Sequence, residues 1–597
     1  ITLALGIGAN TAIFSVVNGV LLKPLPFPHP EQLVAVWLTA PGNNIKDLNP
    51  SPSTYFVFRD QNHSFQHIGL YEGYSVNITG VGQPEHVAGL VVTNDVLPTL
   101  GISPKLGRWF TRADDSPGSA DTVMLTYGYW HRKFGGDQTV LGRAITIDGE
   151  SCEIIGVMPK EFHFGGRNLA VILPMKLDRN KTVLGQFHYY GIARLKPGVT
   201  LARANADAAR MIPILLRSFP PPPGYSLKLF EDLRIGPNLR PLKQAVVGDV
   251  GKLLWVLMGG IGLVLLIACA NVANLLLVRT EGRQRELAIR SALGASRARI
   301  AAEMLLESLS LALFGGMLGI ALAYGALRIL VAMAPGGLPR LNEISIDGTV
   351  LLFTLAVLLL ASLFFGSIPV LKYVGKHIGT GLHQGGRAMT EGRERHRSRN
   401  LLVIAQVALA LVLLISSGLM VRTFRALIEV NPGFVSPSQI QTFRVDIPET
   451  DVKDPVRVVR MEQGILQKIE AIPGVSSVGL SRSVPMDGDE WRDRVLVRGH
   501  TYASGDVPLA RYRFIAPSYF KTLGTPIIAG RDITWSEIYN EVPVAMVSEK
   551  LAREYWDDPA NALGKQIRST TKDDWREIVG VVGNIHDDGM NKPVPSS

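Results

Sequence analysis

The stretch RTEGRQRELAIRSALGASRARI, residues 279–300, carries six arginines and two glutamates between two of the most apolar segments of the chain. Leu253–Val278 before it has no charged residue, and Ser308–Leu327 after it has none either. A helix needs about 20 apolar residues to cross the hydrocarbon core of a bilayer. The alternation therefore predicts a charged loop between two membrane spans.

Membrane spans are also predicted elsewhere in the chain, which has 597 residues and only 19% charged residues, against about 25% in soluble domains. Five segments are long and apolar enough: Ile1–Leu22, Leu253–Val278, Ser308–Leu327 with some extension, Val350–Val370 and Leu401–Val421. The alternative is a set of buried helices in a soluble core, but such helices are usually shorter and keep a polar stripe. The sequence therefore favours five membrane spans.

The lysines and arginines of the short loops predict the orientation of these spans. Residues 279–303 carry six arginines, and residues 372–399 carry seven lysines or arginines. The loop APGGLPRLNEISIDG, residues 334–348, has one arginine against two acids. The two basic loops are thus expected in the cytoplasm, with both long polar stretches outside it. The net charge of +10 is then mainly a topology signal, and nucleic acid is not expected as a partner.

The chain contains an internal duplication. VVTNDVLPTLGISPKLGRWFTRADD (91–115) is similar to FIAPSYFKTLGTPIIAGRDITWSE (514–537), and CEIIGVM (152–158) is similar to REIVGVV (576–582). The offset stays near 423, and chance would not hold that register over so many positions. The repeating unit is one span, an external domain and three spans. We expect the second copy to be cut short and the whole protein to have eight spans.

The external domains are expected to mix strands and helices. AITIDGESCEIIGVMP (144–159) alternates apolar and polar residues around Asp148-Gly149, which predicts a hairpin. LARANADAARMIPILLRSF (201–219) has the spacing of an amphipathic helix. The fold class is therefore an α-helical membrane protein with mixed α/β external domains. The expected divisions are a first span, 1–22; an external domain, 23–252; three spans, 253–372; a basic cytoplasmic linker, 373–399; a span, 400–422; and a second external domain, 423–597.

Motifs of enzymes are missing from the sequence. It has no G-x-x-x-x-G-K-[ST], so the chain is not expected to hydrolyse ATP through a P-loop. It also has no H-E-x-x-H and no G-x-S-x-G. Cys152 and Cys269 fall on opposite sides of the predicted membrane boundary, so no disulfide is expected between them. The chain is expected to be non-catalytic, without cofactor or metal.

Two groups of residues contain side chains that can bind metal ions. His63 and His67 have metal-ligand spacing only if they are helical, and DQNHSFQHIG looks like a loop without a third ligand. The acids of MDGDEWRDR are Asp487, Asp489 and Glu490. A solvated loop is favoured for them over a Ca²⁺ site. Surface or packing roles are therefore expected for both groups.

Small and polar residues inside the spans predict helix contacts. Gly315 and Gly319 form a small-xxx-small pair in the third span, which lets helices approach closely in lipid. Asn271 and Asn274 lie near the cytoplasmic end of the second span. Because no intramembrane carboxylate accompanies them, interhelical hydrogen bonds are favoured over an ion site.

The charged segment itself separates into two faces when RQRELAIRSALGAS (283–296) is placed on a helix. One face is apolar: Ala288, Ile289, Ala292 and Leu293. The other face is charged: Arg283, Glu286 and Arg290. Acid–base pairs stand at i, i+4 in the favourable order, Glu281 with Arg285 and Glu286 with Arg290. Gly294 is expected to end this helix and Ser296 to begin the next.

An amphipathic cytoplasmic helix at the end of a span has two interpretations. The first is a stop-transfer flank that lies on lipid head groups, which explains the arginines. It does not explain the paired glutamates or the defined end of the helix. The second is a surface that a cytoplasmic partner contacts.

At these residues the chain resembles a known family. RTEGRQRELAIRSALGASRARIAAEMLLESL (279–309) closely resembles the signature of MacB/FtsX-type ABC transporter permeases. LALGIGANTAIFSVVNGVLLKPLPFPHPEQLVAVW (3–37) resembles the N-terminal signature of their duplicated subgroup, the duplicated orphan permeases (ADOP). LLVIAQVALALVLLISSGLMVRTF (401–424) looks like the span that opens the second half.

The resemblance implies external domains of the MacB periplasmic core type and a permease that transmits ATP-driven motion across the membrane. A separate ABC ATPase subunit would dock on the charged helix. By analogy the ATPase-coupling residues are Glu281, Arg285, Glu286, Arg290, Gly294 and Ala295. Two departures limit this transfer, because no ATPase is fused within the chain and the coupling segment of the second copy is absent.

The resemblance also implies a bacterial inner-membrane location and a role in efflux or extraction of a substrate. The implied partners are the ATPase subunit, the lipid bilayer, and a periplasmic adaptor or other extracytoplasmic partner. The alternative function is an FtsX-like signal transducer that regulates an extracytoplasmic protein such as a cell-wall hydrolase.

Overall fold

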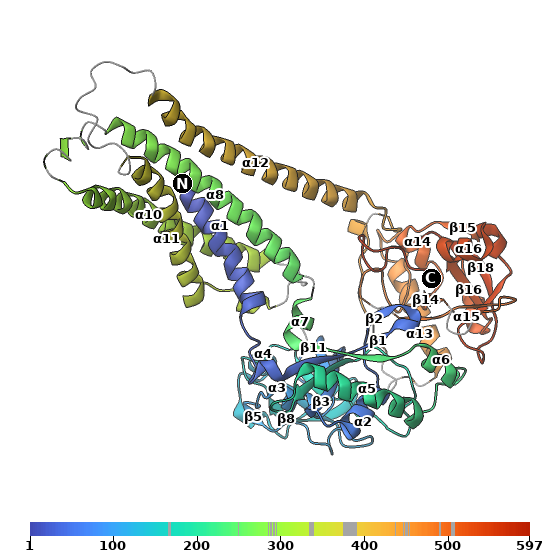
Figure 1. Ribbon diagram of the computed structural model, residues 1–597. Coiled ribbons are helices and arrows are strands. Elements are labelled where there is room, and N and C mark those ends of the chain that lie inside the picture. Colours follow the sequence, from blue (N-terminus) through green and yellow to red (C-terminus); the bar gives the residue numbers. More distant parts are fainter. Residues whose placement is uncertain are drawn as a thin grey trace. The chain divides into compact units, whose positions relative to one another are not determined.

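The structure is a computed structural model that divides into two compact units. The helical unit is Ile1–Leu25 with Lys243–Phe424, and the strand-rich unit is Pro26–Leu242 with Arg425–Ser597 (Figure 1). The structure describes residues 1–597 except 165–168, 249, 284–285, 287–288, 291–292, 294, 334–339, 374–390, 436, 446, 448–451, 453, 489–490 and 503–507. At 281, 297, 342, 372–373, 391–399 and 437 it describes the backbone alone.

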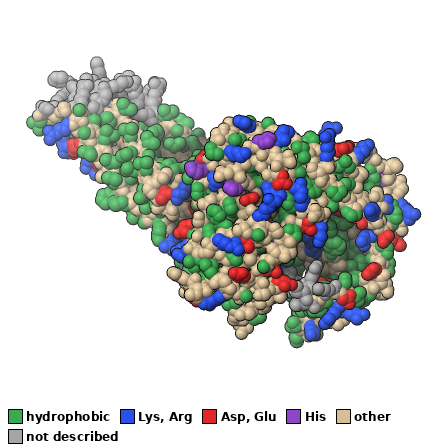
Figure 2. Space-filling model, turned by 90° about the horizontal axis from the view of Figure 1, so that it is seen from below, with side chains coloured by type: hydrophobic (Ala, Val, Ile, Leu, Met, Phe, Trp, Pro, Cys, Tyr) green, Lys and Arg blue, Asp and Glu red, His purple; other side chains and the backbone are tan. Residues whose placement is uncertain are grey.

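Five long helices form most of the helical unit: α1 (Thr2–Val17), α8 (Val250–Gly282), α10 (Arg297–Met333), α11 (Gly348–Tyr373) and α12 (Glu391–Glu429). Each contains one of the predicted spans and is apolar enough to cross a membrane; α1 continues through a single π-helical turn, Asn18–Leu22. Apolar side chains cover much of the visible face of this unit (Figure 2). Many are exposed, including Phe314 and Leu352, each 67% exposed, as lipid contact requires. The five predicted spans are confirmed.

Helix α1 packs against α8, α10 and α11. Its closest approach is to α10, where a Cβ added at Gly8 would lie 2.7 Å from the carbonyl oxygen of Gly319. A Cβ at Gly315 would lie 3.0 Å from the Cβ of Leu3. The predicted small-xxx-small pair therefore does make a close helix contact, since glycine lets the two backbones touch.

Replacing Gly8 by alanine is expected to destabilise the helical unit, because the new methyl group overlaps a backbone oxygen and forces α1 and α10 apart. Overpacking of this kind costs about 1–3 kcal/mol. Gly325→Ala on α10 is the matched control, because no described atom lies within 4 Å of a Cβ there. Thermal unfolding of the purified protein in detergent measures both variants. Equal midpoints for the two would contradict the predicted contact.

Polar side chains connect the spans at a few points. Gln406 on α12 donates from Nε2 to Oδ1 of Asn271 on α8 over 2.7 Å, which confirms the interhelical hydrogen bond expected for Asn271. The Oδ1 atom of Asn274 is buried and has no hydrogen-bond partner among the described residues. Between α1 and α11, the hydroxyl groups of Thr11 and Thr354 are 3.0 Å apart.

The end of α1 is fastened by the segment that connects α10 to α11. The Arg340 guanidinium, only 4% exposed, donates to backbone carbonyls of Val20, Lys23 and Pro24 at 3.1, 2.9 and 2.7 Å. Lys23 also pairs with Asp347 at 2.9 Å. These contacts satisfy carbonyl groups that the end of the helix leaves without partners, so the exit of the first span is held firmly.

The first external domain is built on one large sheet with the strand order β11-β1-β10-β3-β4-β9-β6-β8-β5, to which β2 and β7 add at the side. The strands are β1 (Leu33–Ala40), β2 (Ile45–Leu48), β3 (Phe65–Thr79), β4 (Glu85–Val92), β5 (Leu106–Gly107), β6 (Thr122–Leu125), β7 (Ala144–Ile147), β8 (Glu150–Val157), β9 (Val171–Pro174), β10 (Tyr190–Leu195) and β11 (Gly236–Pro241). The helices are α2 (Pro52–Gln61), α3 (Val96–Leu100), α4 (Tyr127–Phe134), α5 (Leu201–Ser218) and α6 (Leu227–Asp232).

This domain has two apolar cores, and both local predictions are confirmed there. Helix α5 buries Ala204, Ala208 and Met211 in the core that it shares with α2 and β1. Strands β7 and β8 form the expected hairpin, with Asp148 and Gly149 at positive φ in the two-residue turn. Their apolar side chains enter the second core with α4 and β6.

The second external domain repeats part of this plan in shorter elements. Its strands are β12 (Arg492–Arg494), β13 (Leu496–Val497), β14 (Leu509–Arg511), β15 (Ile527–Gly530), β16 (Val544–Ser548), β17 (Gln566–Arg568) and β18 (Arg576–Val582). Its helices are α13 (Pro455–Glu470), α14 (Tyr519–Leu523), α15 (Trp535–Tyr539) and α16 (Glu549–Trp556). The parallel pair β16–β18 matches β6–β8, and a register shift occurs at the same point of both pairs, Met546 opposite Gly580 and Met124 opposite Gly156.

Side-chain contacts also recur in the two copies at an offset of 423. The equivalent residues are Arg108 and Arg531, Thr111 and Thr534, and Asp114 and Glu537. In each copy the arginine donates two hydrogen bonds to the acid, at 2.6 and 3.0 Å in the first and 2.5 and 3.1 Å in the second. The threonine N–H donates to the same carboxylate in both. These bonds lower the pKa of the Asp114 carboxyl, and they lower the pKa of the Glu537 carboxyl to about 2. The duplication inferred from sequence is therefore present in three dimensions.

Two glycines at this offset carry the same backbone constraint. Gly107 and Gly530 have φ of +76° and +78°. A Cβ at Gly107 would lie 2.1 Å from the carbonyl oxygen of Ile155, and one at Gly530 would lie 2.2 Å from that of Val579. Only glycine fits a position that combines positive φ with such a close strand contact.

Candidate functional site

The candidate site is the charged segment between α8 and α10. Among its described residues, the backbone N–H of Leu293 donates to the carbonyl of Ile289, and that of Ala295 donates to the carbonyl of Arg290. Ile289 and Arg290 themselves are helical. The Ser296 hydroxyl accepts from the N–H of Arg299 over 3.3 Å, which confirms Ser296 as the residue that begins the next helix.

Arg290 is the centre of an ion-pair group that joins this segment to α10. Its Nη2 atom donates to Glu286 at 2.5 Å, and its Nη1 atom donates to both carboxylate oxygens of Glu303 at 2.8 and 2.9 Å. The hydrogen bond to Glu303, followed by the charges of both acids, raises the pKa of Arg290. All three side chains are more than 40% exposed, so the group is held in one geometry and also faces solvent.

A second ion-pair group lies one helical turn further along α10. Glu307 accepts from Arg279 at 2.7 Å and lies 3.6 Å from Arg283. Together the two groups fasten the end of α8 and the charged segment to the start of α10. Exposed pairs contribute little to stability, so their main effect here is to set geometry.

The apolar face of the segment is uncovered in the described structure. Ile289 is 61% exposed and Leu293 is 82% exposed. Ala288 and Ala292, the other members of the predicted stripe, lie outside the described residues. The segment thus offers two large apolar side chains next to an ordered group of charges, a combination typical of protein contact surfaces.

The structure describes only some of the predicted coupling residues. Glu286 and Arg290 are in contact as expected, and Ala295 follows them in the same segment. Arg285, Gly294 and the side chain of Glu281 lie outside the described residues. Sequence reasoning missed two acids on α10, Glu303 and Glu307. Their i, i+4 spacing in EMLLES was a signal for them, because it mirrors the spacing of the basic residues.

The residues considered as possible metal ligands do not come together in the described structure. His63 follows the end of α2 and His67 lies in β3, so the two are not on one helix. Asp487 accepts a backbone N–H within its own turn, whereas Asp489 and Glu490 lie outside the described residues. No group of three or more possible metal ligands was found among the described residues.

The two cysteines are both buried and free. Cys152 lies in β8 of the first external domain, and Cys269 lies in α8. Cys152 therefore belongs to the strand-rich unit and Cys269 to the helical unit.

Comparison with known proteins gives two family matches. The MacB-like periplasmic core domain matches residues 1–211 and again residues 401–593. The FtsX-like permease C-terminal domain matches residues 258–378, which include the charged segment. The repeated match agrees with the duplication seen in the structure.

Among curated proteins, the chain is similar to permeases and exporters of ABC transporters. It is 27% identical over 39% of its length to the uncharacterized ABC transporter permease YknZ of Bacillus subtilis (strain 168), of which it covers 54%. It is 30% identical over 36% of its length to a probable export ATP-binding/permease protein MacB of Pseudomonas entomophila (strain L48), of which it covers 30%. For a macrolide export ATP-binding/permease protein MacB of Hahella chejuensis (strain KCTC 2396), the identity is 24% over 54% of this chain and 46% of that protein.

The chain thus spans between 30% and 54% of the length of these relatives. The chain itself combines five apolar spans, two matches to the periplasmic core domain and an FtsX-like permease match that includes the charged segment. The chain is a multi-pass membrane protein of the bacterial inner membrane with large extracytoplasmic domains. It belongs to the family of MacB/FtsX-type ABC transporter permeases.

Proposed function

We propose that this chain is a non-catalytic permease subunit that couples ATP hydrolysis on a separate ATPase subunit to motion of its extracytoplasmic domains, for efflux or extraction of a substrate. The observation that carries the proposal is the segment between α8 and α10, where ordered ion pairs adjoin exposed Ile289 and Leu293. The coupling residues proposed are Glu281, Arg285, Glu286, Arg290, Gly294 and Ala295.

The geometry suggests how motion would pass through the membrane. A displacement of the segment would move α8, whose end it continues, and α10, to which Arg290 and Glu303 tie it. Helix α10 touches α1 backbone to backbone at Gly8 and Gly319. Because α1 leads directly into the first external domain through KPLPFPHP (23–30), and because proline-rich segments are stiff, a shift of α1 would reach that domain.

The same proposal covers the organisation of the chain. We infer extracytoplasmic domains at 23–252 and 423–597, a three-span permease domain at 253–372 and a basic cytoplasmic linker at 373–399. A repeat of the whole first half, with one span, an external domain and three spans, would give a protein of eight spans. One such chain would then supply both halves that a permease dimer otherwise supplies, and the mass of the purified complex would test this.

Association with an ATPase is the direct test of the function. The full-length protein, carrying an affinity tag, is co-expressed with candidate MacB-type ATPases, purified and assayed for ATP hydrolysis in lipid nanodiscs. We expect one ATPase to co-purify in a fixed ratio and to hydrolyse ATP faster in the complex than alone. If no candidate ATPase co-purifies, the charged segment is a membrane-surface flank and the proposed coupling role is wrong.

A further inference from the structure

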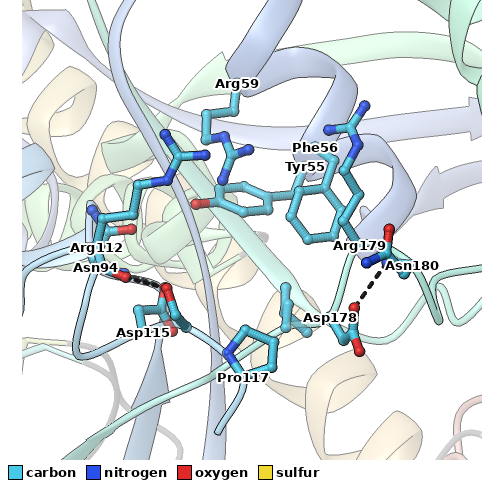
Figure 3. Close-up of a pocket in the computed structure, with 12 residues that line it drawn as sticks. Tyr55, Phe56, Arg59, Asn94, Arg112, Asp115, Pro117, Asp178, Arg179 and Asn180 are labelled. Atoms are coloured by element: carbon cyan, nitrogen blue, oxygen red, sulfur yellow. Dashed lines mark hydrogen bonds between the residues drawn. The ribbon is translucent and has the colours of Figure 1, made fainter. Parts of the chain in front are cut away.

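A cavity of about 360 Å³ lies in the first external domain, far along the chain from the charged segment. Four segments meet around it: α2, the residues after β4, the loop from β5 to β6, and the residues after β9 (Figure 3). Its volume is in the range of pockets that hold small organic molecules. None of the residues that line it has a place in the proposed coupling function.

One wall of the cavity combines aromatic rings with guanidinium groups. Tyr55 and Phe56 come from α2, and both are less than 5% exposed. The guanidinium carbons of Arg59 and Arg179 lie 5.2 and 5.4 Å from the centre of the Phe56 ring. Contacts of this kind hold arginines in place with their charge intact, so the wall presents fixed cationic groups beside apolar surface.

Two of the three arginines that line the cavity bond to the same acid. Arg59 donates to Asp60 from Nε at 2.8 Å, and Arg179 donates to the other oxygen of Asp60 at 2.5 Å. These two arginines therefore share one carboxylate. Arg112, on the β5–β6 loop, is exposed and has no ion-pair partner among the described residues.

The two acids that line the cavity are occupied by the backbone. The carboxylate of Asp115 accepts the N–H groups of Asn94 and Lys176 at 2.8 and 2.7 Å, and Asp178 accepts that of Asn180 at 2.9 Å. Burial raises the pKa of Asp115 to about 6. These acids order the loops around the cavity. Arg112, and the guanidinium donors of Arg59 and Arg179 that do not bond to Asp60, remain for a ligand.

A buried hydroxyl completes the polar side of the cavity. Tyr55 is 2% exposed, and its hydroxyl oxygen has Arg59 and Thr93 nearby but meets the geometry of a hydrogen bond with no described group. In Figure 3 this hydroxyl points toward the side of the cavity where the guanidinium groups of Arg59 and Arg112 lie. A buried polar atom without a partner is costly, and a bound ligand atom would supply one.

We propose that this cavity is a binding site for a small organic anion with a planar aromatic body. Its carboxylate, sulfonate or phosphate group would lie between Arg112 and Arg59 and would accept from the Tyr55 hydroxyl. Guanidinium groups match such oxyanions with paired donors. The aromatic body would pack on the Phe56 and Arg179 side. Binding at this site is independent of the ATPase and extends beyond the proposed coupling function.

The second external domain does not repeat the site. At the offset of 423 that superimposes the two copies, Asn94, Arg112 and Asp115 are replaced by Pro517, Trp535 and Ile538. The framework contacts of the neighbouring residues are kept in both copies. The donors and acceptors of the cavity are therefore a feature of one copy and not a requirement of the shared fold.

The test uses the full-length protein in lipid nanodiscs without any ATPase, with 2-naphthoate and 1-naphthyl phosphate as probes and 2-naphthylmethanol as their neutral counterpart. Isothermal titration is expected to give a Kd on the order of 0.1 mM for the better anion. Arg112→Gln is expected to weaken binding about tenfold, because it removes one charge-assisted contact. Arg203→Gln on the exposed face of α5 is the matched control and should bind like the wild type.

Three results would overturn the proposal: neither anion binds with a Kd below about 1 mM, the neutral alcohol binds as well as the anions, or Arg112→Gln binds like the wild type. Tyr55→Phe gives a second measurement, since it keeps the ring in the core and removes only the hydroxyl. It is expected to weaken anion binding and to keep or raise the midpoint of thermal unfolding, because the removed hydroxyl has no partner in the ligand-free protein. Because no ATPase is present, failure here leaves the coupling proposal untouched, and failure of coupling leaves this one untouched.

Discussion

Replacing Arg290 by glutamate is expected to lower the stimulated ATPase activity of the permease–ATPase complex about tenfold or more. The change places a third carboxylate beside Glu286 and Glu303, which now both bond to Arg290. Like charges at this spacing repel, so the segment would leave its position on α10. ATP hydrolysis by the purified complex in nanodiscs, with the amount of bound ATPase measured in parallel, gives the result.

A triple variant separates contact with the ATPase from local folding. Glu286→Arg, Arg290→Glu and Glu303→Arg together restore every ion pair with the opposite sign. If the charges act on the ATPase surface, as proposed, the triple variant stays inactive. Recovery of activity in the triple variant would show that the pairs matter only inside the permease. Unchanged activity in Arg290→Glu would remove the segment from the coupling mechanism altogether.

Replacing Gly107 by alanine is expected to open the β5–β8 edge of the first external domain. The new Cβ would lie 2.1 Å from a backbone oxygen of β8, and φ of +76° is unfavourable for any residue with a Cβ. The two costs together amount to about 2–5 kcal/mol. Exchange of β8 amide hydrogens, followed by mass spectrometry, should accelerate at least about thirtyfold.

Gly142→Ala is the control that isolates the steric part of this effect. Its φ is +78°, almost the same as at Gly107, but no described atom lies within 4 Å of a Cβ there. It should cost only about 1–2 kcal/mol. Gly530→Ala should accelerate exchange in β18 of the second domain and not in β8. If β8 amide hydrogens exchange at similar rates in the Gly107 and Gly142 variants, the close contact of Gly107 with β8 contributes little to stability.

The sequence predicts those features of the fold that depend on local pattern. Spans were found because the bilayer demands a fixed length of apolar helix, and the β7–β8 hairpin because Asp148-Gly149 suits a tight turn. The duplication was found because glycines and their neighbours keep one register. The span boundaries were less accurate. Helix α10 begins before Ser308 in a segment of mixed polarity and continues after Leu327 through Arg328 into a further apolar run.

The candidate site could be predicted only in part, for a physical reason. The Glu286–Arg290 pair is a contact within one helical turn, which spacing alone predicts. The contact of Arg290 with Glu303 crosses a turn of unknown direction, so spacing alone cannot predict it. The cavity around Tyr55 cannot be predicted from local sequence patterns, because its lining comes from four segments between residues 55 and 180.

The replacement of Arg112 by Trp535 at the equivalent position has a consequence for how such a protein can evolve. In a symmetric dimer of one gene product, every substitution appears on both subunits, so a new surface feature must be tolerated twice. Two copies joined in one chain escape that restriction. The shared framework of arginine, threonine and acid can stay fixed in both copies while each surface is selected separately. One half can then specialise in recognition, and the other keeps the shape that the assembly needs.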